Sequence, residues 1–260
     1  MAYTVVHARG GTPINAARTV KLNSDTNLLK LIAIISMLID HMGSQLFPQY
    51  PVMRQIGRLA FPIFAYCIAV GCIYTRSIWK YALRVGVMAI LVQPLYAATM
   101  GHALSGAFDW AQGFYRPDLI LEHYYSGKLN ILFSLCAGIL LIWTIRDKKY
   151  IATAALIAFL FMFEKRLDYG INGIILMVLF FAFVDRPLIS LTWVGLFMLY
   201  MGAPSLFTQM RPYFGTQIYA LLALPLIYIP MKTGLRLNKY VFYIFYPAHL
   251  ALIFFLKIYL

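Results

Sequence analysis

The chain has 260 residues, of which 62% are hydrophobic and only 12% are charged. Its mean hydropathy is +0.75, whereas soluble domains are roughly half apolar and about a quarter charged, so the composition excludes an ordinary soluble domain. The formal net charge of +13 fits the cytoplasmic loops of a membrane protein better than a nucleic-acid-binding surface, because no basic run is long enough to form a domain.

The start of the chain differs from the rest. Residues 1–27 are polar and contain Arg9, Arg18 and Lys21, without the apolar stretch of a cleaved signal peptide. We therefore expect a flexible cytoplasmic N-terminal tail over 1–27 and a single transmembrane domain over 28–260.

The apolar segments are continuous rather than alternating, which predicts helices and not a barrel. The predicted fold class is all-α, a polytopic membrane helix bundle with about nine transmembrane helices. The segments are 28–46, 58–75, 82–100, 129–145, 150–163, 170–185, 188–203, 216–231 and 240–258.

The basic residues predict the orientation. With the N-terminus inside, most of the 22 Lys and Arg residues fall in cytoplasmic loops. We expect a multi-pass protein of the inner (cytoplasmic) membrane, with a cytoplasmic N-terminus and, after nine crossings, an external C-terminus. The surrounding membrane lipid is then its first partner.

The first segment, LLKLIAIISMLIDHMG, contains two adjacent ionisable residues near its end. Such residues inside a span are costly and indicate a functional site. Asp40 and His41 are adjacent, so on a helix they point about 100° apart and do not pair with each other. A carboxylate that orients His41 would come from another helix, and Asp168 at the start of DYGINGI is a candidate.

Two later segments add charged or titratable groups. Arg58 begins GRLAFPIFAY, in which Pro62 removes a backbone hydrogen bond and can kink the helix. Arg58 either pairs with Asp40, holds an anionic group or carbonyl oxygen, or merely extends to the interface. His249 follows Pro247 in the last segment, and with His41 it gives two imidazoles suited to proton transfer.

The remaining polar candidates are ambiguous. Asn130 and Gln93 are either contacts between helices or substrate contacts. The external loop 101–128 contains Glu122 and His123 among aromatic residues, and it is either a substrate-contacting flap or part of an aromatic belt. No HExxH, CxxC or glycine-rich phosphate loop is present, so no metal site is expected.

Five pieces of the sequence, in this order, resemble the TraX family of bacterial membrane proteins. They are LIDHMG, GRLAFPIFAY, LNILFSL, DYGINGI and FYIFYPAHLALI. The name-giving member acetylates the N-terminal alanine of conjugative F pilin. The resemblance therefore implies acetyl transfer from acetyl-CoA to an acceptor at the outer face, most simply the N-terminus of a pilin-like protein.

The acyltransferase-three group of membrane enzymes is similar in plan and also has a His at the end of its first span. Its members acylate sugars of surface glycans, so O-acetylation of a glycan is an alternative implied by the resemblance. A proton-coupled transporter that uses Asp40, His41, Arg58 and His249 as a relay is a third reading. A non-catalytic assembly factor, with structural polar groups, is a fourth.

Acetyl transfer needs a base for the acceptor and a donor for the oxyanion. Under the resemblance, His41 is the base, with Asp168 or Asp40 as its orienting carboxylate. Arg58 stabilises the oxyanion or balances Asp40, and His249 is a second base or protonates the departing thiolate.

Acetyl-CoA is cytoplasmic, so its pantetheine arm would thread between the helices. Basic residues at the inner mouth would then hold the phosphates, although the positive-inside rule accounts for them without a ligand. These residues are Arg76, Lys80, Arg84, Arg146 and Lys148.

Overall fold

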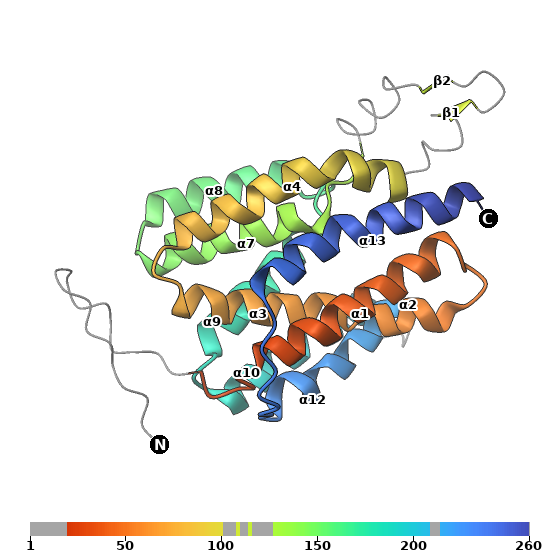
Figure 1. Ribbon diagram of the computed structural model, residues 1–260. Coiled ribbons are helices and arrows are strands. Elements are labelled where there is room, and N and C mark those ends of the chain that lie inside the picture. Colours follow the sequence, from red (N-terminus) through yellow and green to blue (C-terminus); the bar gives the residue numbers. More distant parts are fainter. Residues whose placement is uncertain (1–19, 101–107, 110–113, 116–126, 209–213, 260) are drawn as a thin grey trace.

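The secondary structure is almost entirely helical, which confirms the all-α prediction. The computed structural model describes residues 20–100, 108–109, 114–115, 127–208 and 214–259 (Figure 1). Its helices are α1 (Thr26–Gln45), α2 (Pro51–Gly57), α3 (Ala60–Tyr74), α4 (Ile78–Met100), α7 (Ile131–Arg146), α8 (Tyr150–Met162), α9 (Gly170–Phe183), α10 (Pro187–Gly202), α11 (Pro204–Thr208), η1 (Thr216–Leu222), α12 (Ala223–Tyr228) and α13 (Lys239–Tyr259). A short antiparallel pair joins β1 (Phe108–Asp109) to β2 (Phe114–Tyr115).

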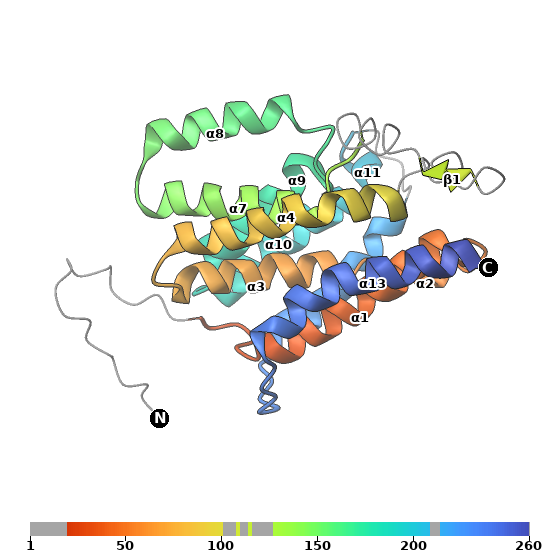
Figure 2. The ribbon, with the colours of Figure 1, turned by 45° about the horizontal axis from the view of Figure 1, so that its top comes forward.

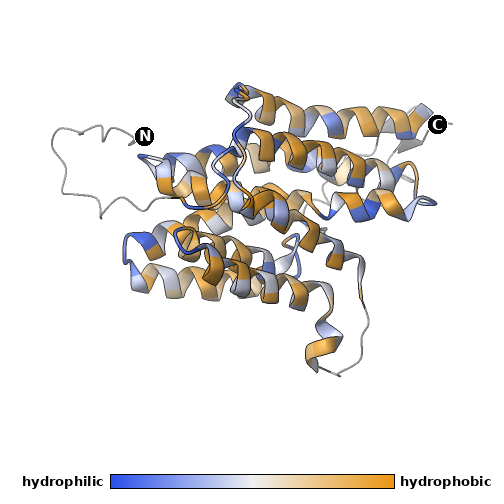
Figure 3. Cartoon of the chain, turned by 90° about the horizontal axis from the view of Figure 1, so that it is seen from below, coloured by the Kyte–Doolittle hydropathy of each residue, from blue (hydrophilic) through white to orange (hydrophobic). Residues whose placement is uncertain are grey.

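Among the described residues, four helices are long and apolar enough to cross a membrane. They are Thr26–Gln45, Pro51–Tyr74, Ile78–Met100 and Tyr240–Tyr259. Helices α7 to α10 and the segment Thr216–Tyr228 are apolar but shorter, with 10–17 residues each. Hydrophilic residues gather at the ends of the helices, and hydrophobic residues cover the lengths between them (Figure 3). The structure thus has the character of a membrane protein, while nine complete crossings remain a prediction.

The described residues before α1 are packed against the bundle. Leu22 is buried, Lys21 N donates to the carbonyl of Val184 (3.2 Å), and Asn23 N donates to the carbonyl of Ile227 (3.0 Å). This differs from the flexible tail expected over 1–27, because an apolar side chain is buried here and the backbone finds partners at the ends of α9 and α12. Residues 1–19 lie outside the described residues.

Helix α3 is the centre of the bundle. It packs against α1, α7, α9 and α12, and its residues Ile63, Ala65, Tyr66 and Ala69 are fully buried. The Tyr66 hydroxyl donates to the carbonyl of Asn23 at 2.6 Å, which ties α3 to the segment before α1. By contrast, α8 lies on the outside against α7, and most of its side chains are exposed (Figure 2).

The span from Pro51 to Tyr74 is interrupted at Arg58 and Leu59, between α2 and α3. Pro62 has no N–H to donate to the carbonyl of Arg58 four residues earlier, so the break falls where this proline predicts it. Helix α2 packs closely against α1. The interruption therefore places the arginines of α2 beside the end of α1.

The two ends of the bundle carry different connections. The start of α1, the α3–α4 turn and the α7–α8 turn lie at one end, and the α1–α2 connection and the end of α13 lie at the other (Figures 1 and 2). The described C-terminal residues are thus at the opposite end of the bundle from the start of α1.

Candidate functional site

A cavity of about 270 Å³ lies where the last turns of α1 meet α2, α3, α4 and the start of α9. Its walls contain the carboxylates of Asp40 and Asp168 and the guanidiniums of Arg54 and Arg58, together with His41. The lining residues are Met37, Asp40, His41, Ser44, Gln45, Arg54, Gly57, Arg58, Ala60, Phe61, Phe64, Tyr96, Met100, Ile131, Asp168 and Tyr169.

Asp40 forms ion pairs with two arginines of the neighbouring helix. Its Oδ2 accepts from Arg54 Nη1 at 2.6 Å and its Oδ1 accepts from Arg58 Nη2 at 2.5 Å. The Asp40 and Arg58 side chains are only 11% and 14% exposed, and Arg54 is 39% exposed. Because the carboxylate is largely removed from water, it depends on these charge-assisted bonds.

Two glycines allow α1 and α2 to approach closely enough for this pairing. A β-carbon at Gly57 would overlap with the Asp40 carboxylate, and a β-carbon at Gly43 would lie 2.6 Å from the β-carbon of Met53. Both helices therefore use glycine at their contact, and the Asp40 carboxylate occupies the space that a larger residue at Gly57 would fill.

His41 points away from Asp40, as their adjacent positions on a helix require. Its Nδ1 lies 2.9 Å from Nε2 of His249 on α13. The other ring nitrogen of His249, Nδ1, lies 2.9 Å from the backbone carbonyl of Phe245 in the same helix. His249 is only 3% exposed, so this chain of two imidazoles ends inside α13.

These contacts determine the tautomers of the two neutral rings. A carbonyl oxygen only accepts, so His249 Nδ1 carries a proton and its Nε2 presents a lone pair. His41 Nδ1 must then donate to that lone pair, which leaves His41 Nε2 unprotonated. No described residue forms a hydrogen bond with this nitrogen, and His41 lines the cavity, so its lone pair is available to take a proton.

The orienting partner of His41 differs from the one expected. Neither Asp168 nor Asp40 holds the imidazole; His249 does. Asp40 is already committed to Arg54 and Arg58, and Asp168 lines the same cavity without contacting His41. Sequence reasoning favoured a carboxylate because a carboxylate is the common orienting group, but a neutral imidazole with a fixed tautomer serves equally well as an acceptor.

Arg58 connects the Asp40 carboxylate to residues on the other side of the cavity. Its Nη1 lies 3.4 Å from the Tyr169 hydroxyl and 3.5 Å from Oε1 of Gln217, so these two contacts are long. Asp168 precedes Tyr169, and burial raises the pKa of this carboxyl, while Lys128 and Arg58 act in the opposite direction. Both Arg58 and Asp168 line the cavity.

Asn130 forms buried hydrogen bonds that join the start of α7 to α4. It caps α7 by accepting from Leu132 N (3.0 Å), and its amide donates to the carbonyl of Ala89 (2.8 Å) and to Oε1 of Gln93 (2.9 Å). Asn130 is fully buried and lines neither this cavity nor a second one described below, so a role as a substrate contact has no support here. Glu122 and His123 lie outside the described residues.

The basic residues expected to hold phosphates lie on the α3–α4 turn, on α4 and around the α7–α8 turn. None of Arg76, Lys80, Arg84, Arg146 and Lys148 lines either cavity. Arg146 Nε forms an ion pair with Asp147 at 3.1 Å. These positions are those that the positive-inside rule explains without a ligand.

Three residues of the site were missed from the sequence. Arg54 is separated from Arg58 by one helical turn, and this spacing could have indicated a second guanidinium on the same face of α2. Tyr169 and Gln217 reach Arg58 from distant segments, and no local pattern marks either of them.

The fold and the cavity define a class: a helical membrane protein with a histidine and an arginine–carboxylate cluster at one end of its bundle. A family model described as TraX protein matches residues 25–257, and the chain belongs to this family. The chain is 26% identical over 243 residues to the probable fimbrial assembly protein FimC, serogroup H1, of Dichelobacter nodosus, covering 86% of this chain and 92% of that protein.

A shorter similarity links the chain to the uncharacterized protein RP591 of Rickettsia prowazekii (strain Madrid E). The two are 50% identical over 40 residues, which is 15% of this chain and 16% of that protein. No solved structure matches the chain significantly.

Proposed function

We propose that this protein is a membrane acetyltransferase that moves the acetyl group of acetyl-CoA to the N-terminal amine of a pilin-like subunit at the outer face of the inner membrane. The observation that carries the proposal is the unprotonated Nε2 of His41. It faces a cavity that also holds two guanidiniums, and it has no partner among the described residues.

His41 is the general base in this reaction. Its Nδ1–H is held by His249, and His249 is held by the carbonyl of Phe245, so the imidazole keeps one orientation. When Nε2 takes a proton, the resulting imidazolium keeps its hydrogen bond to His249. His249 is thus the positioning residue for the base.

The transfer step needs no reactant besides the acceptor amine and the acetyl thioester. The acceptor nitrogen attacks the thioester carbonyl, a C–N bond forms, and Nε2 of His41 takes the amine proton. The carbonyl oxygen becomes an oxyanion, and we assign Arg58 Nη1 as its donor, because the contacts of this nitrogen to Tyr169 and Gln217 are long. When the tetrahedral intermediate collapses, the C–S bond breaks and the imidazolium returns the proton to the thiolate of CoA.

The acceptor is proposed from the family and from the fimbrial relative. The resemblance to TraX implies N-terminal acetylation of a pilin, and the relative from Dichelobacter nodosus is described as a probable fimbrial assembly protein. A pilus-related acceptor agrees with both. A glycan hydroxyl is the alternative acceptor, because the same base would deprotonate it.

The geometry favours an enzyme over a proton relay. From His41 the hydrogen bonds lead to His249 and then to the carbonyl of Phe245, which cannot pass a proton onward. The chain of imidazoles therefore orients a base and does not form a continuous path along the bundle.

The test is an acetylation assay on membranes that contain the full-length protein. Labelled acetyl-CoA is supplied together with a pilin that has a free N-terminus or with surface glycan extracts. We expect wild-type protein to label the pilin, and His41→Ala to lower the rate by about 100- to 10,000-fold, the usual contribution of a general base.

The matched control is Ile35→Ala, which lies on the same helix with an exposed side chain. It should retain wild-type labelling. Equal labelling by wild type and His41→Ala would contradict the proposed base. Labelling of glycan in place of pilin would reassign the acceptor, and no labelling at all by wild type would contradict the enzyme proposal.

A further inference from the structure

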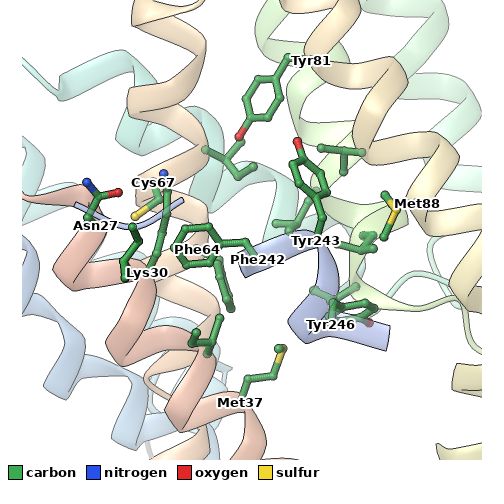
Figure 4. A pocket seen from close by; sticks show the side chains of 17 residues that line it. Asn27, Lys30, Met37, Phe64, Cys67, Tyr81, Met88, Phe242, Tyr243 and Tyr246 are labelled. Carbon is green, nitrogen blue, oxygen red and sulfur yellow. The ribbon is translucent and has the colours of Figure 1, made fainter. Parts of the chain in front are cut away.

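A second cavity of about 280 Å³ lies between α1, α3, α4, α7 and α13 (Figure 4). Three residues, Met37, Phe64 and Ile131, line both this cavity and the one that contains His41. The two cavities therefore share a wall. The second cavity extends along α1 from this wall to Lys30 and Asn27 in the first turns of the helix.

The walls are apolar except for a few well-placed groups. Phenol side chains of Tyr81, Tyr243 and Tyr246 project from α4 and α13 toward the space between the helices (Figure 4). The hydroxyl of Tyr246 is buried and lies close to the backbone of Ile131, without a well-formed hydrogen bond to any residue that the structure describes. A narrow ligand with amide groups would satisfy such hydroxyls better than a plain hydrocarbon chain.

The connection 229–238 between α12 and α13 crosses the start of α1 (Figure 1). Asn27 Nδ2 donates to the carbonyl of Leu235 (3.0 Å), and Asp25 Oδ2 accepts from the backbone N–H (2.7 Å) and the hydroxyl (2.6 Å) of Thr233. Leu237 of this connection lines the cavity. The connection is thus fixed to α1 beside the cavity.

Three cations lie on α1 or on the connection. Lys30 lines the cavity with its Nζ 5.5 Å from the ring centre of Phe242, and Lys232 and Arg236 are exposed on the connection that is bound to the start of α1. No described carboxylate forms an ion pair with any of the three. Such cations near an apolar cavity suit a ligand with a phosphate-bearing head and a narrow tail.

We propose that the second cavity binds the arm of the acyl donor, a phosphate-bearing thioester with an amide-containing arm. Its head lies at Lys30, Lys232 and Arg236, and its thioester lies at the wall of Met37, Phe64 and Ile131. The proposal rests on the proposed acetyl transfer, and it assigns the head to cations other than those on the α3–α4 and α7–α8 turns.

The dimensions agree with this arrangement. The rise along α1 from Lys30 to His41 is about 16 Å at the usual rise of an α-helix. An extended pantetheine arm has a comparable length. A donor with its phosphates at Lys30 would therefore bring its thioester to His41 without crossing the rest of the bundle.

A phospholipid offers similar chemistry, since it also has a phosphate head and a narrow tail. The hydroxyls of Tyr81 and Tyr246 distinguish the two sources, because a lipid chain has no group to bind them. The experiment must therefore compare CoA with a lipid on the same variants.

The test measures CoA binding to the purified full-length protein in nanodiscs, with Lys30→Glu, Lys232→Glu and Arg236→Glu combined. We expect CoA affinity to fall by about tenfold or more, because three attractive charges become repulsive. The matched control combines Arg76→Glu, Lys80→Glu and Arg84→Glu, which changes the same net charge at the same end of the bundle, and it should alter the affinity by less than about twofold.

A second variant tests the arm. Tyr81→Phe with Tyr246→Phe keeps the rings and should weaken CoA binding several-fold, while retention of phosphatidylglycerol, measured by native mass spectrometry, stays unchanged. If the double variant leaves CoA binding unaltered, or if the triple variant loses only bound lipid, the donor site is overturned. A larger loss in the control than in the triple variant would also overturn it.

The two proposals can fail separately. CoA binding that depends on Lys30, Lys232 and Arg236, without acetylation of any acceptor, would support the binding site and contradict the proposed reaction. Acetylation that depends on His41 but is insensitive to the triple variant at low donor concentration would support the reaction and contradict the route of the donor.

Discussion

The two cavities share one helix and one wall, yet they differ in chemical character. The residues of α1 at positions 30, 34, 37, 41 and 44 are spaced by three or four, so they form one stripe that faces first the apolar cavity and then the polar one. In the apolar cavity this stripe meets aromatic side chains. At the polar cavity His41 of this stripe meets His249 of α13, and Arg54 of α2 and Arg58 just after it line the same cavity.

The comparison distinguishes a cavity suited to binding a substrate from a cavity suited to its chemical conversion. Apolar walls bind through area and shape, whereas the polar cavity depends on a few charge-assisted contacts in a poorly solvated place. Substitutions at Asp40 or Arg58 should therefore have larger effects than conservative substitutions in the apolar walls.

Asp40→Asn is the substitution in the polar cavity from which we expect the largest loss of stability and activity. The amide keeps the size of the side chain but leaves Arg58, which is 14% exposed, without its counterion. Removing one partner of a poorly exposed ion pair costs about 3 kcal/mol. We expect a lower Tm in detergent for the variant and loss of acetylation.

The matched control is Arg54→Gln, which removes the more exposed partner. Because Arg54 is 39% exposed, its contribution is screened, and we expect a cost of about 1 kcal/mol or less. An equal loss of thermal stability in both variants would contradict the claim that the Asp40–Arg58 pair dominates this cluster.

The sequence alone predicts much of the difference between the polar and the apolar part of α1. An ionisable pair inside an apolar run marks Asp40 and His41 as costly, and helix geometry predicts that they point in different directions. The missing N–H of Pro62 predicts the break before it. Each of these inferences depends on one short segment.

The sequence failed where two distant segments meet. The partner of His41 lies on the last helix, and nothing near His249 specifies which side chain its Nε2 will contact. The connection 229–238 lies outside the apolar segments, yet its Leu237 lines a cavity, and Asp25 and Asn27 bind the connection to α1. The basic residues of the loops also favour the α3–α4 and α7–α8 turns as the site of the donor's phosphates, because composition does not show where the cavities lie.

A second prediction concerns the orientation of His41. His249→Leu removes the acceptor for His41 Nδ1–H, so the ring can turn and change its tautomer. We expect the acetylation rate to fall by about 100-fold, the lower end of a general-base contribution. His249→Gln supplies an amide oxygen as acceptor, and we expect it to recover at least part of the rate.

The pair of variants distinguishes positioning from chemistry. If His249 itself transfers the proton, Gln and Leu will be equally inactive, because neither titrates. If His249 only fills space, both will be active as long as the protein folds. Greater activity with Gln than with Leu, at equal expression and equal Tm, is the result that the hydrogen-bond chain predicts.

The third prediction tests the packing that supports the polar cavity. Gly57→Ala places a β-carbon where the Asp40 carboxylate lies, so either the carboxylate or α2 must move. Overpacking of this kind costs about 1–3 kcal/mol, and a displaced carboxylate also loosens its bonds to both arginines. We expect lower thermal stability together with a lower acetylation rate.

Gly195→Ala on α10 is the matched control, because its nearest neighbour, Leu224 Cδ1, would be 3.8 Å from the new β-carbon. It adds a methyl group at ordinary contact distance, so Tm and rate should stay close to wild type. If Gly57→Ala behaves like this control, the contact between α1 and α2 is looser than the ion pairs imply. If Gly57→Ala lowers the acetylation rate but raises Tm, the native position of the Asp40 carboxylate is strained. The charged cluster of the polar cavity then lowers the stability of the folded protein.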